Sequence, residues 1–189
     1  MKLVFATNNM HKLEEVRGIL PSVFQIISLS ELGCTDEIEE TGQTLEDNSL
    51  IKAQYIWNRY HVDCFADDTG LEIEALNGQP GVYTARWAGV EHDDAANRQK
   101  ALKQMQGVSN RRARFRTVVT LIRNGQVQQV EGVVWGMIAT AEHGQGGFGY
   151  DPLFIPDGYD KTFAELPQTV KNTISHRARA MQNLKQLLV

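Results

Sequence analysis

The sequence has 189 residues, of which 42% are hydrophobic and 22% are charged, and this composition fits a soluble globular domain rather than a disordered chain or a membrane protein. The formal net charge of −4 argues against a nucleic-acid-binding protein, because such proteins usually present a basic surface. We therefore expect a single domain over residues 1–189 that binds neither nucleic acid nor membranes.

Two cysteines, Cys34 and Cys64, stand far apart, and neither lies near a histidine at the spacing of a metal site. We interpret them as reduced thiols, which favours a cytoplasmic location. The apolar run of residues 1–6 ends at Thr7, so it is too short for a signal peptide or a membrane span. We therefore expect the protein to stay in the cytoplasm.

The first part of the chain alternates strands and helices. Residues 2–6 form an apolar run typical of a buried strand, and apolar residues at helical spacing predict a helix over 11–20. A pattern similar to a capping box at Thr44 predicts a second helix from there to about residue 60. Residues 63–66 then indicate a short strand, which we expect to end in a turn over 67–70 because carboxylates and glycine favour turns.

The second part begins with a helix predicted over 93–105, and alternating residues predict a strand over 113–123. The Asn-Gly dipeptide at 124–125 predicts a tight hairpin, so residues 126–138 should return antiparallel to the preceding strand. A last helix is predicted over 175–188. Together these elements predict an α/β fold with a mixed central β-sheet flanked by helices.

A polar segment joins the first predicted strand to the first predicted helix. Free backbone N–H groups and the positive end of the helix dipole can bind an anion there, and phosphate is the natural candidate. Lys12 would add a full charge, although the segment lacks the glycines of a Walker loop. The alternative is an ordinary turn in which Asn8 or Asn9 caps the helix. The candidate residues are Thr7, Asn8, Asn9, Met10, His11 and Lys12.

Two acidic clusters lie far apart in the sequence, one containing Glu39 and Glu40 and the other Asp67 and Asp68. Mg²⁺ prefers a few carboxylates together with water and phosphate oxygens, so both clusters could contribute to one metal site. For the first cluster the alternative is a solvated acidic surface. Asp67 and Asp68 follow an apolar run, and burial of their charges would require partners.

Residues 144–152 contain four glycines, followed by aromatic and acidic residues. Glycine allows the backbone to approach a ligand closely. Phe148 could stack on a base, and Asp151 could accept a hydrogen bond from one. The alternative is a flexible connection between two strands.

Lys171, His176 and Arg177 lie around the predicted start of the last helix. Cations there oppose the helix dipole, and such conflicts with local preference occur at functional sites. His176 and Arg177 could donate hydrogen bonds to the carbonyl groups of a base, whereas an amino group in that position would place donor against donor. The alternative is that all three are ordinary surface charges.

Four segments together resemble the inosine triphosphate pyrophosphatase family, and they occur in that family's order and spacing. They are residues 7–12, 65–71, 147–154 and 174–177. Two further blocks, over 39–52 and 80–89, are also similar to the family. The resemblance covers essentially the whole chain, and several blocks in register are far more specific than one alone.

The resemblance implies a two-lobed α/β fold with a cleft between the lobes, a homodimer and Mg²⁺ as cofactor. It implies that Asp68 is the general base and that Asp68 binds Mg²⁺ with Glu39 or Glu40. It also implies that Lys52 joins residues 7–12 in binding the triphosphate. The remaining residues implied to contact the substrate are Thr69, Phe148, Gly149, Tyr150, Asp151, Lys171, His176 and Arg177.

Some positions depart from the family's commoner pattern. Thr69 stands where serine is frequent, and because threonine keeps the hydroxyl group we expect activity to survive. Val170 stands where glutamate is frequent and removes a possible partner for Lys171 or Arg177. The detail of base selection therefore stays open.

The activity that the resemblance implies is hydrolysis of inosine, deoxyinosine or xanthosine triphosphate to the monophosphate and pyrophosphate, with the preference among the three left open. One alternative is a Maf-type pyrophosphatase. The segments 147–154 and 174–177 argue against this alternative. Another is an inactive nucleotide sensor, or an RNA-binding module that uses the basic run 111–116. The Asp67-Asp68 pair argues against an inactive protein, and the net charge argues against RNA.

Overall fold

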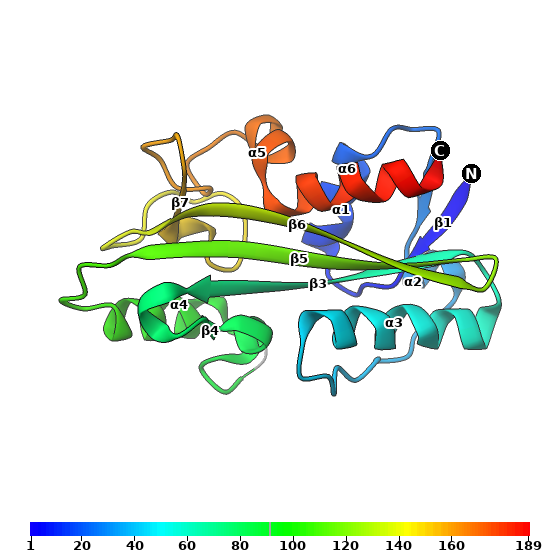
Figure 1. The fold of residues 1–189 in the computed structure, drawn as a ribbon, viewed down its shortest axis with the longest axis horizontal. Coiled ribbons are helices and arrows are strands. Elements are labelled where there is room, and N and C mark those ends of the chain that lie inside the picture. The colour runs from blue at the N-terminus through cyan, green and yellow to red at the C-terminus, as the bar shows by residue number, and fades with distance from the viewer. Residues whose placement is uncertain (91) are drawn as a thin grey trace. The chain divides into compact units, whose positions relative to one another are not determined.

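The structure is a computed structural model that describes residues 1–90 and 92–189 (Figure 1). Its strands are β1 (Lys2–Phe5), β2 (Gln25–Ile27), β3 (Cys64–Ile73), β4 (Gln79–Pro80), β5 (Arg112–Arg123), β6 (Gln126–Ile138) and β7 (Phe154–Pro156). Its α-helices are α1 (Met10–Ile19), α2 (Leu29–Leu32), α3 (Leu45–Tyr60), α4 (Asp94–Gln104), α5 (Gln168–Ile174) and α6 (His176–Leu188). Short 3₁₀ helices cover Glu74–Leu76, Gly81–Arg86 and Asp151–Leu153.

The strands form one sheet in the order β2-β1-β3-β5-β6-β7, and β4 pairs with β3. β1 is parallel to β2 and β3, whereas β7 is antiparallel to β6 and β4 is antiparallel to β3. The expected mixed α/β fold is therefore confirmed. Within the described ranges, none of the helices combines the length and the apolar character that crossing a membrane requires.

The chain divides into two compact units. Unit 1 comprises Met1–Asp68, Thr117–Gly132 and Arg177–Val189, and unit 2 comprises Thr69–Arg116 and Val133–His176. Strands β3, β5 and β6 each contribute residues to both units.

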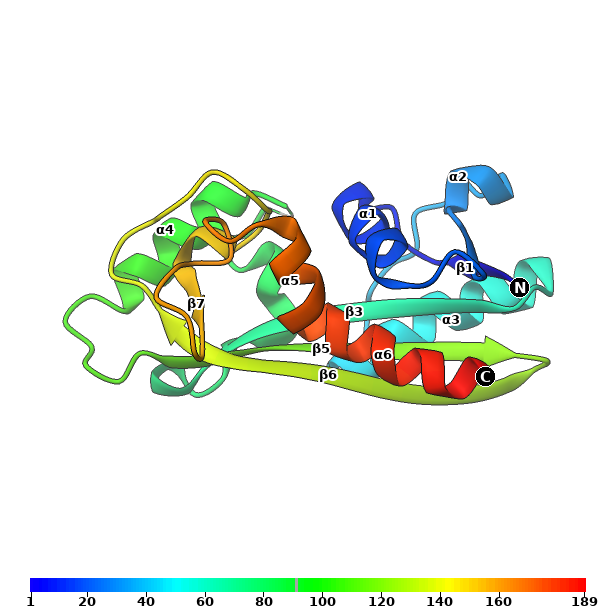
Figure 2. The same cartoon turned by 90° about the horizontal axis from the view of Figure 1, so that it is seen from above.

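In unit 1, helices cover both faces of the sheet, and β1 shows why. Successive side chains of a strand point to opposite faces, so Leu3 and Phe5 pack with α1 and α6, while Val4 packs with α2 and α3. The same alternation along β3 places Phe65 in the first cluster and Ala66 in the second. Figures 1 and 2 show α6 and α3 on opposite sides of these strands.

The core of unit 2 is rich in aromatic side chains. Phe115 of β5 packs edge-to-face on Phe154 of β7, with ring centroids 4.7 Å apart, and Phe154 stacks on Phe163. Leu71 and Ile73, from the second half of β3, join the same buried cluster. This part of β3 is thus held by apolar contacts.

Several local predictions are confirmed. Thr44 caps α3 by accepting a hydrogen bond from the backbone N–H of Asp47, and the helix ends at Tyr60 as expected. Asn124 and Gly125 both have positive φ values and join the adjacent strands β5 and β6 as the expected hairpin.

The expected turn over residues 67–70 is wrong, because β3 continues without interruption from Cys64 to Ile73. Turn preference assumes that polar side chains face water. Here Asp67 is 1% exposed and Asp68 is 7% exposed, and both have partners inside the protein. Buried pairing thus overrides the local preference of the two carboxylates.

The expected single helix over 175–188 is preceded by a separate helix, α5, that the sequence did not predict. Ser175 is extended, with φ −66° and ψ 161°, and separates the two helices. Lys171 therefore lies in the last turn of α5 rather than beside the start of α6. A cation is favourable at the C-terminal end of a helix. The expectation that Lys171 opposes the helix dipole is therefore wrong.

Candidate active site

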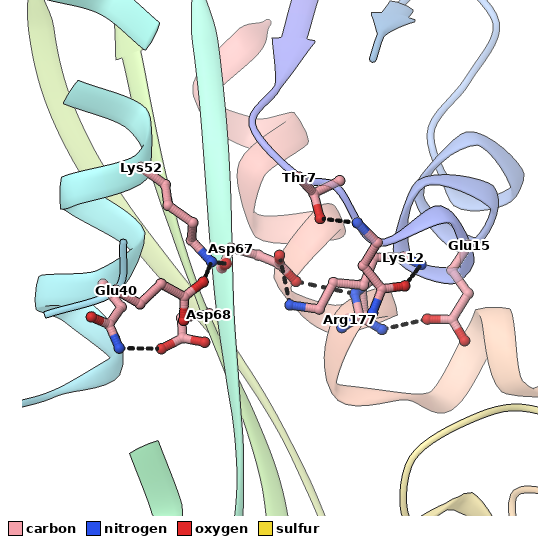
Figure 3. Close-up of polar contacts among 10 residues, drawn as sticks. Thr7, Lys12, Glu15, Glu40, Lys52, Asp67, Asp68 and Arg177 are labelled. Carbon is pink, nitrogen blue, oxygen red and sulfur yellow. Dashed lines mark hydrogen bonds and ion pairs between the residues drawn. The ribbon is translucent and has the colours of Figure 1, made fainter. Parts of the chain in front are cut away.

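Asp67 and Asp68 are neighbours on β3, and the strand directs their carboxylates to opposite faces of the sheet in unit 1. Asp67 shares the face of Phe65, toward α1 and α6, while Asp68 shares the face of Ala66, toward α3. Figure 3 shows the two side chains on either side of the strand. The two carboxylates therefore have different partners, and their chemical environments differ.

Asp67 lies between two cations. Lys12 Nζ is 3.0 Å from its Oδ1, and Arg177 Nε is 3.3 Å from its Oδ2. Burial alone would raise the pKa of Asp67, but Lys12, Arg177 and Lys52 together bring this pKa well below its ordinary value. Asp67 is thus ionised at neutral pH and holds Lys12 and Arg177 on one face of the sheet.

Arg177 begins the segment Arg177–Val189 of unit 1 and is 1% exposed. Its Nη1 donates to Glu15 of α1, in addition to the contact between its Nε and Asp67. Burial opposes its charge, but these two carboxylates raise the pKa of the guanidinium. The structure thus places Arg177 in an ion-pair network with Lys12, and its expected contact with a base stays a prediction.

The turn between β1 and α1 has the helix cap that one of the two interpretations predicted. Asn9 Oδ1 accepts a hydrogen bond from the backbone N–H of Lys12 and caps α1, as the simpler alternative proposed. The hydroxyl group of Thr7 accepts from the backbone N–H of Asn9. Asn8, Met10 and His11 are at the surface, whereas the side chain of Lys12 is 15% exposed.

Asp68 occupies the opposite face and has a different environment. Its Oδ2 accepts a hydrogen bond from Asn48 Nδ2 at 3.0 Å, and Asn48 Oδ1 accepts from the backbone N–H of Gly42 at 2.8 Å. Burial is the largest cause that raises the pKa of Asp68 to about 6, with Glu40 adding to it and Lys52 opposing it. Such a carboxyl group can take up a proton near neutral pH.

Lys52 of α3 connects the acidic segment to β3. Its Nζ donates to Glu40 Oε1 at 2.5 Å and to the backbone carbonyl of Asp67 at 2.6 Å. Burial disfavours its charge, but Glu40, Asp68 and Asp67 outweigh this and raise its pKa. Lys52 is therefore a charged ammonium group held beside Asp68.

Glu40 and Asp68 are the carboxylates that fit a divalent cation. The negative charge of Glu40 acts on Asp68, and a cation between such groups would relieve both the repulsion and the cost of burying a charge. Glu39 is exposed. Among the residues that the structure describes, no three His, Cys, Asp or Glu side chains gather as a metal site, so Mg²⁺ there would rely on water and substrate oxygens for its other ligands.

In unit 2, Asp151 organises the glycine-rich segment. Its Oδ2 accepts hydrogen bonds from Lys171 Nζ at 2.6 Å and from the backbone N–H of Phe148 at 2.9 Å. Lys171 Nζ also lies 5.0 Å from the centre of the Phe148 ring, which is a cation–π contact. Gly147 has φ +69°, and a side chain there would collide with the Asp151 carboxylate. The segment around Phe148 is thus fastened by specific contacts rather than flexible.

The other expected substrate contacts of unit 2 have varied environments. His176 is 4% exposed, and its ring stacks on Phe115 with centroids 4.6 Å apart. Tyr150 donates its hydroxyl hydrogen to the backbone carbonyl of Thr84 at 2.8 Å, and Thr69 is half-buried on β3. His176 and Tyr150 are therefore built into the unit rather than being surface side chains.

The basic run 111–116 lies at the start of β5, and its arginines have partners. Arg112 pairs with Asp157 at 2.6 Å and Arg114 pairs with Glu72 at 2.5 Å. Arg111 donates to the backbone carbonyls of Ile138 and Ala139. These contacts agree with a strand whose charges are paired or solvated and give no support to an RNA-binding surface.

Two residues of unit 1 were missed as site residues. Glu15 lies between Leu13 and Val16, which are both buried, so an acidic residue next to apolar positions of α1 was a usable signal. Asn48 lies within the block 39–52 that is similar to the family, but no role was expected for it. Its role depends on contacts with Asp68 and Gly42, which no local pattern of sequence reveals.

A sequence profile of the Ham1 family matches residues 3–187. The chain is 48% identical over 188 residues to a dITP/XTP pyrophosphatase of Flavobacterium johnsoniae, covering 100% of this chain and 98% of the relative. It is 46% identical to the dITP/XTP pyrophosphatase of Bacillus subtilis over 189 residues, covering 98% and 96% of the two chains.

Solved structures agree with this relationship. The Ham1 protein of Staphylococcus aureus has a TM-score of 0.89 at 38% identity, covering 100% of this chain and 98% of the other. A Ham1 protein of Coxiella burnetii has a TM-score of 0.90 at 37% identity, with the same coverage. The resemblance seen in the sequence motifs is thus confirmed along the full length, and the chain belongs to the Ham1 family.

Proposed function

We propose that the protein hydrolyses deaminated purine nucleoside triphosphates, such as inosine, deoxyinosine and xanthosine triphosphate, to the monophosphate and pyrophosphate. The observation that carries this proposal is Asp68, a buried carboxyl group with a pKa raised to about 6, whose charge interacts with those of Lys52 and Glu40. The names of the full-length relatives, which are dITP/XTP pyrophosphatases, support the substrate class.

In the proposed reaction, a water molecule attacks the α-phosphorus of the triphosphate. Asp68 accepts a proton from this water as the new P–O bond forms, and the bond to the bridging oxygen breaks so that pyrophosphate leaves. Lys12 and Lys52 stabilise the negative charge on the phosphate oxygens. Residues 7–12 orient the triphosphate through backbone N–H groups at the start of α1.

We assign Asp67 a positioning role in this reaction. It holds the ammonium group of Lys12 at 3.0 Å, and its backbone carbonyl accepts from Lys52 at 2.6 Å. Both lysines that we propose to bind phosphate are therefore anchored by one residue. Arg177, which shares the Asp67 carboxylate, supports the same arrangement.

We propose Mg²⁺ as the cofactor, held by Asp68 with Glu40 and with Glu39 as the alternative partner. When bound, the ion neutralises charge on the triphosphate and lowers the pKa of coordinated water. The protein's own groups at this position supply carboxylate oxygens, which are the ligands that Mg²⁺ prefers.

For the base we propose contacts from unit 2. Phe148 supplies an aromatic face, and Gly149, Tyr150 and Asp151 follow it in the chain. Lys171 and His176 are the candidate donors to the carbonyl groups of the base. A site built on such hydrogen bonds can reject a mismatched group by roughly 10⁴-fold or more. We further propose that residues 1–189 act as one catalytic domain of a cytoplasmic homodimer.

The proposal predicts selective hydrolysis. With Mg²⁺, kcat/KM for inosine and xanthosine triphosphates should exceed that for ATP and GTP by at least about 100-fold, a gap of roughly 2.7 kcal/mol, because the amino groups of normal bases meet donors rather than acceptors. Release of pyrophosphate from each triphosphate measures this directly. Comparable rates on ATP would contradict the predicted specificity. If none of the four triphosphates is hydrolysed, the result would favour a nucleotide sensor.

A further inference from the structure

Gly149, in the segment that we propose to receive the base, has both of its backbone polar groups bound by one helix. Its N–H donates to Asp94 Oδ2 at 2.9 Å, and its C=O accepts from Arg98 Nη1 at 2.9 Å. Gly149 has φ +61°, a left-handed conformation that favours glycine, although a side chain there would meet no atom within 4 Å. The backbone conformation, and not lack of space, therefore favours glycine at this position.

Asp94 and Arg98 are four residues apart on α4, so they lie on the same face of the helix, one turn from each other. With this spacing, the two side chains can bind the same residue of the segment, one at its backbone N–H and the other at its backbone C=O. Arg98 Nε also lies 3.2 Å from Oε1 of Glu142, which precedes this segment in the chain. The Arg98 side chain, which is 18% exposed, thus contacts both Gly149 and the residue Glu142 that lies shortly before the segment.

Phe148 lies next to this attachment and has a second one of its own. Its N–H donates to Asp151, and its carbonyl accepts from the N–H of Asp151 at 3.1 Å. The carboxylate of Asp151 is in turn fixed by Lys171. The peptide that carries the Phe148 ring is therefore held on one side by Asp151 and on the other, through Gly149, by α4.

We propose that Asp94 and Arg98 form a clamp that fixes the position of Phe148 and thereby sets the selectivity for the base. Neither residue belongs to the motifs that indicated the family, and both act through the backbone of Gly149. The inference rests on the proposed function, because Phe148 is assumed to stack on the base. A ring that is fixed in advance loses little freedom when the base binds, which favours tight and selective binding.

The first experiment measures the clamp itself, without any substrate. In Asp94→Ala and Arg98→Met, amide hydrogen exchange of the segment 144–151 should become at least about tenfold faster than in the unchanged protein, because the Gly149 peptide loses charge-assisted hydrogen bonds. Asp94→Asn should restore much of the protection, since its amide oxygen can still accept from Gly149. Unchanged exchange in both Asp94→Ala and Arg98→Met would overturn the clamp.

The second experiment measures selectivity. Both variants should raise KM for inosine triphosphate about tenfold with kcat within about twofold, and the ratio of kcat/KM for inosine triphosphate to that for ATP should fall by a similar factor. Glu142→Ala is the matched control, because it removes the other partner of Arg98 and leaves both contacts to Gly149. Its ratio should stay within about twofold of the unchanged protein.

The results separate this inference from the proposed function. Faster exchange with an unchanged substrate ratio would show that Asp94 and Arg98 only stabilise the fold, and would overturn their role in selectivity. If the unchanged protein hydrolyses no inosine triphosphate, the proposed function fails together with the claim of selectivity, and the exchange measurement still decides whether the clamp exists.

Discussion

Asp68→Asn should lower kcat by about 10³-fold and at the same time make the metal-free protein more stable. Activity falls because asparagine cannot accept the proton from water and removes a charge that would hold Mg²⁺. Stability rises because an ionised carboxylate in this buried position is costly, as its raised pKa shows. Steady-state kinetics and urea unfolding in EDTA at pH 7.5 measure the two effects.

The gain in stability should depend on pH in a defined direction. The pKa of Asp68 is about 6 in the folded protein and close to 3.8 when unfolded, so the ionised group costs stability at pH values above 6. Two pKa units correspond to about 3 kcal/mol, and we expect a gain in the unfolding free energy of about 1–3 kcal/mol at pH 7.5. This advantage should shrink as the pH falls from 6 to 4, because Asp68 becomes protonated in the folded protein over this range and no longer carries a buried charge.

Asp67→Asn is the matched control, because it makes the same chemical change one residue earlier on the same strand. It removes the charge that Lys12 and Arg177 share, and Arg177 lies in a buried environment. This variant should therefore be less stable than the unchanged protein at pH 7.5, the opposite of Asp68→Asn. If both variants shift stability in the same direction, the two carboxylates do not occupy the distinct environments that β3 gives them.

The local part of the fold was predictable because it depends on neighbouring residues. The hairpin follows from Asn124-Gly125, and α3 begins at the cap Thr44 and ends where the apolar pattern ends. The candidate site could also be proposed from sequence, since Lys12, Lys52 and Asp68 stand in motifs. These features require no knowledge of contacts between distant segments.

The prediction that failed concerns a segment whose structure depends on contacts between distant parts of the chain. Residues 67–70 look like a turn, and only the pairing of Asp67 with Lys12 and with Arg177, which is 110 positions away, allows a charged pair to remain in a buried strand. The error had a functional consequence. A turn would leave both carboxylates free to approach one metal ion, whereas a strand sends them to opposite faces and leaves only Asp68 beside Lys52 and Glu40.

Arg177→Ala should lower the free energy of unfolding by about 3–5 kcal/mol, because it removes the buried cation that two buried carboxylates share. Glu15 and Asp67 are 7% and 1% exposed, and both contact the guanidinium group. Urea unfolding at pH 7.5 measures the loss. Lowering the pH should reduce the difference between the two proteins, since protonation of the carboxylates removes the unpaired charges.

The double variant Glu15→Gln with Arg177→Met tests whether charge or packing causes this loss. It removes one cation and one anion while keeping side chains of similar length, and Lys12 remains as the partner of Asp67. We expect it to recover at least half of the stability lost in Arg177→Ala, because replacing a buried ion pair costs far less than breaking one. A double variant as unstable as Arg177→Ala would mean that the shape of the arginine, and not its charge, holds α1 and α6 together.

Inhibition by tripolyphosphate tests the link between Arg177 and the phosphate-binding lysine. If Arg177 supports Lys12 through Asp67, the inhibitor should bind more weakly to Arg177→Ala. An arginine that contacts only the base would leave this inhibition unchanged.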